Sequence, residues 1–216
     1  MRLLYVSQLA DHTHPRRTAT LVEAEHLPPT FADLGATLVI HDATRAPPPP
    51  VDGFHGVVIG GSFGSANDEE PWRVALREWL AAFPADLPLL GLCGGHQLLA
   101  RAKGGVVEVS PGPQNGIFPL SLPGIEGYTG VVVQMHGERV AVPPPGAEVW
   151  ATDDMGIQAL RYAPHRWTFQ FHPELSRPLL EAAGSLDETP AAWEGLDTAV
   201  AGGRAVLRAW LATIAR

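Results

Sequence analysis

The feature that most constrains the fold of this chain is a set of short runs that are apolar almost without interruption. Four of them lie in the first half: RLLYVSQL at 2–9, ATLVIHDA at 36–43, GVVIGG at 56–61 and LPLLGLC at 87–93. Strands with apolar residues on both faces are typical of parallel sheets that helices cover on both sides. The chain is therefore predicted to be an α/β protein with an open, mostly parallel sheet and helices on both faces.

Helical patterns separate these runs. In DEEPWRVALREWLAAF at 68–83, the apolar residues fall on one helical face, and Pro71 stands in the first turn, where helices accept proline. GGHQLLARA at 94–102 is predicted to be a second helix, which ends near Gly104-Gly105. Alternation of strands and helices favours parallel pairing of the strands.

Further helices are predicted near both ends of the chain. One lies near 18–26 and is expected to break at Pro28-Pro29, because proline removes a helical hydrogen bond and clashes with the preceding turn. The segment 184–203 is interpreted as a loop with a short helix. The last helix is marked by Leu207, Trp210, Leu211 and Ile214.

The second half of the chain is richer in strands, which are predicted at 130–136, 147–152, 156–162 and 166–172. In the last of these, RWTFQFH, aromatic residues alternate with Thr168, Gln170 and His172. A period of two is the pattern of a strand that buries one face and exposes the other. This strand is therefore expected to be half-buried.

Length and composition limit the classes of protein that the chain can represent. The 216 residues suffice for a single domain, 1–216, with an ordinary core. A net charge of −8 argues against a general nucleic-acid binder. The first apolar run is too short for a signal peptide, no run is long enough to span a bilayer, and one cysteine can form no internal disulfide. A cytoplasmic location is expected.

The lone cysteine, Cys93, stands between an apolar run and a helix. Gly91-Leu92-Cys93-Gly94-Gly95 fits the nucleophile-elbow pattern, in which a sharp strand-to-helix turn strains the central residue and requires small neighbours. The turn would lift the sulfur to the positive end of the helix, where a thiolate is favoured over a thiol. The alternative is a small core residue without a chemical role.

A base for this cysteine is offered by RWTFQFHPELS. In an extended segment, His172 and Glu174 point to the same side, and Pro173 biases the backbone of His172 towards extended conformations. Glu174 could then fix the tautomer of His172 and stabilise its imidazolium. The alternative is a surface histidine beside a solvated acid.

The motifs GLCGGHQLLA and FQFHPE, in this order, resemble those of the class I glutamine amidotransferases, and the resemblance extends from Gly56 to about Glu174. It implies a flavodoxin-like sheet with the nucleophile elbow after a central strand. It also implies a Cys-His-Glu triad, in which Cys93 is the nucleophile, His172 the general acid and base, and Glu174 the orienting carboxylate.

The same resemblance implies further residues around the substrate. Gly61, in VVIGGSFGS, is the expected second backbone donor of an oxyanion hole beside Gly94. Gln97 matches a glutamine that helps to hold the substrate. VVVQMHGERV resembles the Ser-His-Gly-Asp segment of the branch that includes GMP synthetases, and so places Met135 and His136 near the substrate.

Four departures from the family pattern lie near this pocket. Ser62 stands where proline is common, and Gly94 where Tyr or Leu is common. Met135 and Glu138 replace the usual Ser and Asp. The triad is intact, so these changes bear on the choice of substrate.

The resemblance implies that Cys93 attacks the side-chain amide of glutamine, or of another γ-glutamyl compound, and forms a thioester. The chain has no room for a synthetase, so three possibilities stay open. A separate synthetase accepts the ammonia, the protein is a free-standing γ-glutamyl hydrolase or peptidase, or it is a non-catalytic binding or assembly protein on the same fold. No cofactor, nucleic-acid partner or membrane partner is expected.

A metal site is also not expected. His12 and His14 follow the first strand and could contribute ligands, but no third ligand is identifiable, so this segment is interpreted as an ordinary polar loop.

Overall fold

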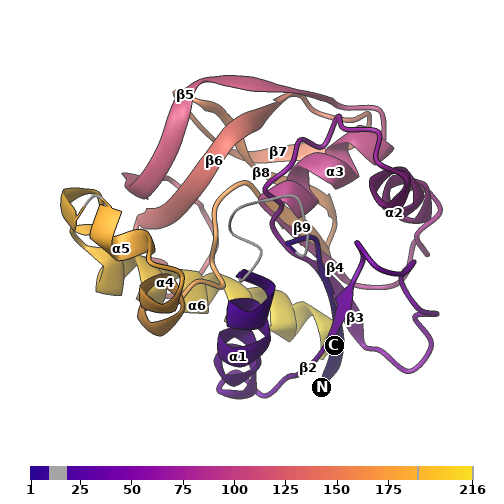
Figure 1. Cartoon of the computed structure of the whole chain (residues 1–216), viewed down its shortest axis with the longest axis horizontal. Helices are drawn as coiled ribbons and strands as arrows, with labels where there is room; N and C mark the ends of the chain where they lie inside the picture. Colours follow the sequence, from indigo (N-terminus) through magenta and orange to yellow (C-terminus); the bar gives the residue numbers. More distant parts are fainter. Residues whose placement is uncertain (10–18, 189, 216) are drawn as a thin grey trace.

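A computed structural model describes residues 1–9, 19–188 and 190–215 of the chain (Figure 1). Within these residues, nine strands form one sheet, and the order along its main path is β2-β1-β3-β4-β9-β8-β6-β5, with β7 paired to β8. The strands are β1 (Arg2–Ser7), β2 (Thr37–Asp42), β3 (Gly56–Ile59), β4 (Leu89–Leu92), β5 (Val106–Pro119), β6 (Val131–Val142), β7 (Glu148–Asp153), β8 (Gly156–Ala163) and β9 (Arg166–Phe169).

Helices occupy most of the segments between the parallel strands, and others follow the last strand. They are α1 (Ala19–Ala32), α2 (Pro71–Ala81), α3 (Gly94–Ala102), α4 (Arg177–Ala182), α5 (Ser185–Glu188), the 3₁₀ helix η1 (Pro190–Trp193) and α6 (Leu196–Ile214). In the described part of the chain, no helix combines the length and the apolar character needed to cross a bilayer.

The first five strands along the sheet, β2, β1, β3, β4 and β9, are parallel to one another, whereas β8, β7, β6 and β5 pair antiparallel. The prediction of an open, mostly parallel α/β sheet is thus confirmed. Because β3, β4 and β9 are neighbours and run in one direction, the segments that follow them emerge at the same edge. Those segments carry Gly61, Cys93 and His172.

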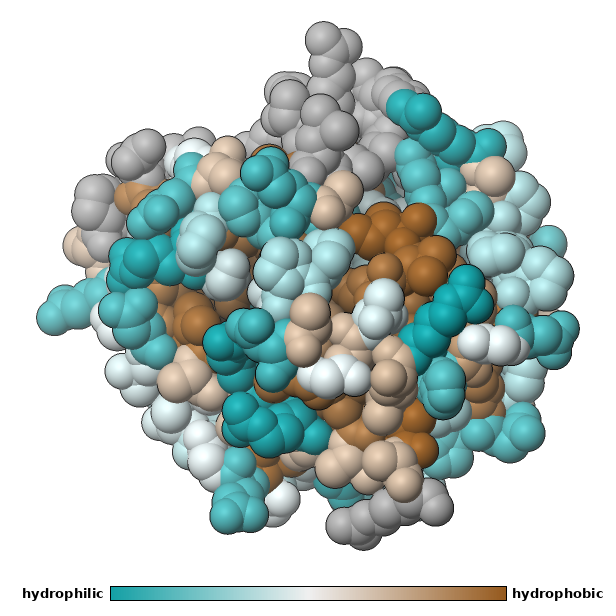
Figure 2. Space-filling model, turned by 90° about the horizontal axis from the view of Figure 1, so that it is seen from below, coloured by the Kyte–Doolittle hydropathy of each residue, from teal (hydrophilic) through white to brown (hydrophobic). Residues whose placement is uncertain are grey.

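Two hydrophobic cores lie on opposite faces of the sheet. Along β1, Leu3 and Tyr5 pack with residues of α1 and α6, while Leu4 and Val6 pack with residues of α2 and α3. This alternation explains why β1 is apolar on both faces. Figure 2 shows one outer face of the molecule, with hydrophilic side chains over most of its rim and apolar ones gathered near its middle.

The predicted break at Pro28-Pro29 is wrong, because α1 continues through both prolines to Ala32. Leu27 and Phe31 flank the prolines and are almost fully buried in the core. Their burial, worth about 2 kcal/mol each, offsets a large part of the cost of about 3 kcal/mol for each of the two interior prolines. Tertiary packing therefore overrides the local signal.

The expectation of a half-buried strand at 166–172 is also wrong. Thr168 and Gln170 are as completely buried as Phe169 between them. The reason is that β9 lies inside the sheet, between β4 and β8, and both of its faces are covered. The alternation marks polar residues that hydrogen-bond inside the protein: Thr168 Oγ1 lies 2.8 Å from His96 Nδ1.

The interpretation of 184–203 as a loop with a short helix is only partly correct. α5 and η1 are short, but α6 begins at Leu196 and carries Gly202 and Gly203 in its interior. An added Cβ on Gly203 would lie 2.9 Å from the Cα of Pro173. Gly203 therefore allows α6 to approach the segment that carries the histidine. The strand β5 was not predicted from the sequence.

The packing of α3 against β3 generates a prediction about Gly95. A Cβ on this residue would clash with the backbone oxygen of Ile59 and lie 2.9 Å from its carbonyl carbon. We expect Gly95→Ala to lower the free energy of unfolding by about 3 kcal/mol or more, because a strand backbone cannot move aside cheaply. Urea denaturation checks this, with Gly137→Ala, where no atom lies within 4 Å, as the control. Equal stability of the two variants would contradict it.

Candidate active site

Cys93 forms a sharp turn between β4 and α3. Its φ of 49° and ψ of −104° make it the one non-glycine residue with positive φ among those described. A side chain held in such a conformation costs on the order of 1–3 kcal/mol, so the surroundings must impose it. The N–H of Cys93 donates to Phe169 O at 2.8 Å, and α3 begins at the next residue. The predicted elbow geometry is confirmed.

The two glycines assigned to an oxyanion hole lie beside this turn. A Cβ on Gly94 would lie 2.6 Å from Ser62 N, and one on Gly61 would lie 3.3 Å from His172 Cε1 and 3.9 Å from Cys93 Cβ. The loop after β3 is therefore packed directly against the elbow. Gly61 also lines the cavity that contains Cys93, and the role of Gly61 and Gly94 as oxyanion donors stays a prediction.

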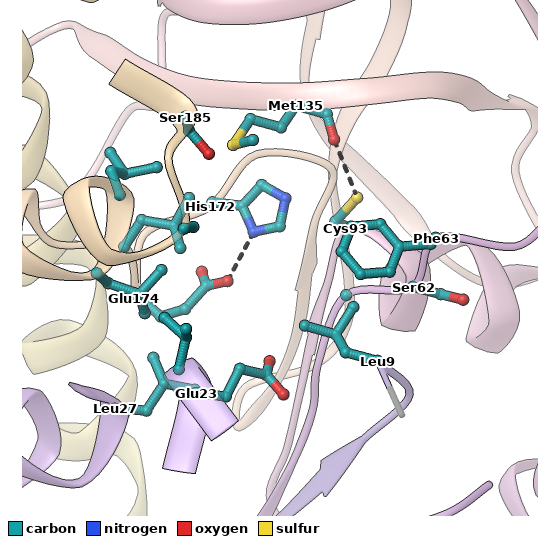
Figure 3. A pocket seen from close by; sticks show the side chains of 16 residues that line it. Leu9, Glu23, Leu27, Ser62, Phe63, Cys93, Met135, His172, Glu174 and Ser185 are labelled. Carbon is teal, nitrogen blue, oxygen red and sulfur yellow. Dashed lines mark hydrogen bonds and ion pairs between the residues drawn. The ribbon is translucent and has the colours of Figure 1, made fainter. Parts of the chain in front are cut away.

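His172 and Glu174 form the expected pair. His172 Nδ1 lies 2.6 Å from Glu174 Oε1, and Figure 3 shows the imidazole between this carboxylate and Cys93. Burial lowers the pKa of His172, but the charges of Glu174 and Cys93, with the hydrogen bonds that both make, outweigh burial and hold this pKa well above its usual value. The structure thus brings together all three residues predicted as a triad.

Gln170 contacts the sulfur, and the sequence analysis missed it. Its Nε2 donates to Cys93 Sγ at 3.7 Å, while Sγ itself lies 3.7 Å from Met135 O. Gln170 lies directly after β9 and is fully buried. The alternation in RWTFQFH was the available signal, because a polar residue in phase with His172 shares its side of the strand.

Gln97 is occupied by contacts inside the protein. Its Nε2 donates to Glu138 O at 2.9 Å and to Gln170 Oε1 at 3.1 Å. The amide of Gln97 therefore ties α3 to β6 and to the residue that contacts the sulfur. A direct contact between Gln97 and substrate stays a prediction.

His136 is likewise enclosed. Its Nε2 lies 2.7 Å from Gln134 Oε1 and its Nδ1 lies 3.0 Å from Glu138 O, so an acceptor stands at each ring nitrogen. Two acceptors favour an imidazolium, yet burial and then the charge of His172 lower the pKa of His136 to about 4. The ring is therefore neutral near pH 7 and donates through one nitrogen. It fixes the backbone of the Met135–Glu138 segment, and a role in substrate binding stays a prediction.

A cavity of about 170 Å³ opens beside the triad. Cys93, His172 and Glu174 form one part of its wall, and Met135 and the loop after β3 another. The remainder comes from α1, α4 and the start of α5, and is apolar except for two residues. These are Glu23 and Ser185.

Glu23 is a second buried acid, which the sequence analysis also missed. Its two carboxylate oxygens accept hydrogen bonds from Tyr5 and Ser7, both at 2.6 Å. Burial is the main reason that the pKa of Glu23 is raised to about 7, and the charge of Glu174 adds to it, while the hydrogen bonds from Ser7 and Tyr5 oppose it. Nothing in the sequence distinguishes this glutamate, inside a predicted helix, from an ordinary exposed one.

No group of three or more His, Cys, Asp or Glu side chains in the described ranges is placed to hold a metal ion. His12 and His14 lie outside the described residues.

Comparison with known proteins places the chain in a family. The family model described as glutamine amidotransferase class-I matches residues 27–181, so the chain belongs to this family of cysteine-dependent glutaminase and amidotransferase enzymes. A solved glutamine amidotransferase from Thermotoga maritima superposes with a TM-score of 0.77 over 100% of this chain and 99% of the other. At 20% identity, that likeness shows a shared fold.

Curated relatives carry two kinds of name. A glutamine-hydrolyzing GMP synthase of Porphyromonas gingivalis is 34% identical over 59% of this chain and 26% of its own length. Gamma-glutamyl peptidase 2 of Arabidopsis thaliana is 30% identical over 59% of this chain and 56% of its own length. One subunit of the glutamine-hydrolyzing GMP synthase of Ignicoccus hospitalis is 32% identical over 62% of this chain and 77% of its own length. The chain thus spans about a quarter of the first relative and just over half of the second.

The contact between Glu174 and His172 predicts the titration of the imidazole. In Glu174→Gln the pKa of His172 should fall, because the charge that opposes burial most strongly is gone. NMR of the ring Cε1 proton measures this. Glu181→Gln, an exposed change in α4, is the matched control. A titration midpoint that is the same in both variants would refute the coupling.

The raised pKa of Glu23 predicts a pH-dependent stability. Because this pKa is about 7 in the folded chain against 4.5 as the ordinary value, the stabilising contribution of the carboxyl is complete below pH 4.5 and is lost as pH rises through 7. Between pH 5 and pH 8, the free energy of unfolding of Glu23→Gln should therefore gain about 2.5 kcal/mol relative to the wild type. Urea denaturation at both pH values tests this, and a difference that does not change with pH would disprove it.

Proposed function

We propose that residues 1–216 form a single glutaminase-type domain that hydrolyses the side-chain amide of glutamine, or of another γ-glutamyl compound, through a thioester on Cys93. The observation that carries the proposal is the arrangement of the triad. A strained turn presents the sulfur at the N-terminus of α3, and a histidine locked to a buried carboxylate at 2.6 Å faces it.

In the first half of the reaction, the thiolate of Cys93 attacks the amide carbon, a C–S bond forms, and an electron pair moves to the carbonyl oxygen. The N–H groups of Gly61 and Gly94 stabilise this oxyanion. His172 then gives its proton to the nitrogen, the C–N bond breaks, and ammonia or an amine departs. The charge of Glu174 supports this step, because it stabilises the imidazolium before the transfer.

In the second half, a water molecule gives a proton to His172 and attacks the thioester. The C–S bond breaks, glutamate leaves, and the sulfur is a thiolate again. Gln170 assists at both ends of the cycle, because its Nε2 lies 3.7 Å from Sγ and stabilises negative charge there. Gln97 and His136 border the proposed glutamyl side, which they shape mainly through the backbone of β6, whereas Met135 lines the cavity beside Cys93 and is proposed to contact the substrate there.

The names of the relatives support two possible fates for the nitrogen that is released from the substrate. The GMP synthase relative of Ignicoccus hospitalis supports a separate ammonia-accepting synthetase, because the chain covers 77% of a protein whose name denotes one subunit. The gamma-glutamyl peptidase supports a free-standing hydrolase. The cavity beside His172 favours the second, because ammonia alone needs no apolar chamber.

The proposed thioester is tested by mass spectrometry of the protein, quenched during turnover of glutamine or γ-glutamyl amides. We expect an added γ-glutamyl group on Cys93 and release of glutamate. Cys93→Ala should lose both, with activity lower by about 10⁴-fold or more. Circular dichroism controls for folding of the variant. Glutaminase activity retained by folded Cys93→Ala would rule the proposal out.

A further inference from the structure

The cavity beside the triad has a defined position relative to the chemistry. His172 and Glu174 form part of its wall, whereas Gln97 and His136, which border the proposed glutamyl side, do not. His172 delivers the proton to the departing nitrogen, so the group attached to that nitrogen lies on the side of His172. A substituent on the amide nitrogen therefore extends into this cavity.

The size of the cavity exceeds what ammonia needs. About 170 Å³ corresponds to five or six times the ~30 Å³ that one water molecule occupies in the liquid. Leu27, Leu175 and Leu179 contribute to its apolar wall, and ammonia makes no use of such a surface. A chain of roughly five or six non-hydrogen atoms fills the space and gains about 0.8 kcal/mol for each buried methylene group.

Two carboxyl groups border this apolar space, and one has an oxygen without a partner. Glu174 is 3% exposed, and its Oε2 has no hydrogen-bond partner although it is buried. Glu23 accepts two hydrogen bonds but has lone pairs left for a third. Figure 3 shows both carboxyl groups beneath His172, and the charge of Glu174 helps to raise the pKa of Glu23.

A buried carboxylate in an apolar chamber is costly unless a cation or donor meets it, and this cost raises the pKa of Glu23 to about 7; a bound cation would lower this pKa again. A neutral alkyl group would cover Glu23 and Glu174 Oε2 without satisfying either, and a carboxylate would add repulsion. An alkylammonium group satisfies both requirements, because its methylene chain suits the leucines and its N–H groups donate to the carboxylates.

We propose that this cavity is a leaving-group subsite for aliphatic diamines, so that the protein cleaves γ-glutamyl amides in which one amine is acylated and the other is a free ammonium ion. This inference rests on the proposed function and specifies its substrate class. The amide C–N bond breaks as the C–S bond forms, His172 supplies the proton to the leaving nitrogen, and water later cleaves the thioester. The products are glutamate and the free diamine.

The test compares γ-glutamyl amides of equal length on the purified full chain: those of 1,4-diaminobutane, of pentylamine and of 4-aminobutyric acid, with glutamine as the reference. We expect kcat/KM for the diamine amide to exceed that for the pentyl amide by at least tenfold, and the carboxylate to be the poorest of the three. Equal rates for the three amides, or a preference for the carboxylate, would overturn the proposal.

Two variants locate the effect. Glu23→Gln should reduce the preference for diamine over pentylamine at least fivefold, whereas Glu181→Gln, the matched change on the exposed face of α4, should leave it unchanged. Ala183→Phe, at the exposed rim of the cavity, should lower kcat/KM for both extended amides relative to that for glutamine. An unaltered preference in folded Glu23→Gln would refute the role of this carboxylate.

A binding measurement on the wild type needs no variant, so a variant that fails to fold cannot affect it. 1,4-Diaminobutane should slow alkylation of Cys93 by iodoacetamide more than the uncharged 1-pentanol does at the same concentration. Equal protection by the two compounds contradicts the subsite. If glutamine acylates Cys93 but the diamine amide is not preferred, only the subsite is wrong. If no γ-glutamyl donor acylates Cys93, the proposed function itself fails.

Discussion

The site depends on the close approach of the elbow after β4 to the end of β3. Gly94 and Gly95 lie against Ser62 and Ile59 at distances that leave no room for a Cβ, and Cys93 between sheet and helix is held at a φ of 49°. The strain of about 1–3 kcal/mol is sustained because β4 lies in the middle of a parallel sheet with cores on both faces. A looser sheet would let the cysteine relax and would carry the sulfur away from His172.

The second constraint on the site is the burial of charged groups, which couples Cys93 to His172 and Glu174, far along the chain. Burial alone would leave His172 neutral, so the protonated ring exists only because Glu174 and Cys93 flank it. The same burial outweighs the opposing contacts of Glu23 and of His136, whose pKa values move towards the neutral forms, to about 7 and about 4. One apolar environment thus disfavours a charge that has no partner and retains the imidazolium of His172, which has two partners.

Short-range patterns predicted the parts of the molecule that short-range physics determines. The elbow at Cys93 and the pairing of His172 with Glu174 follow from glycine spacing and from the i, i+2 geometry of an extended segment. Patterns failed where packing against distant residues decides the outcome. The helix α1 passes through Pro28-Pro29 because Leu27 and Phe31 on either side are buried in the core. Gln170 is buried beside the sulfur because both faces of β9 are covered. Glu23 lay outside any motif, since its environment arises from Tyr5 and Ser7 on the strand β1, whereas Glu23 itself lies on α1.

The two sides of the triad consist of different types of side chain, and this difference bears on how the choice of substrate can change. On one side, the amide of Gln97 and the neutral ring of His136 both contact the backbone oxygen of Glu138 in β6. Because Gln97 also donates to Gln170, which contacts the sulfur, a substitution of Gln97 disturbs the sulfur. On the side of the cavity, α1 and α4 contribute apolar side chains such as Leu27 and Leu179, which can form no hydrogen bond with the elbow. Under the proposed function, recognition of the common γ-glutamyl group therefore belongs to the side of Gln97 and His136. Recognition of the proposed amine belongs to α1 and α4, where residues can change without disturbing the elbow.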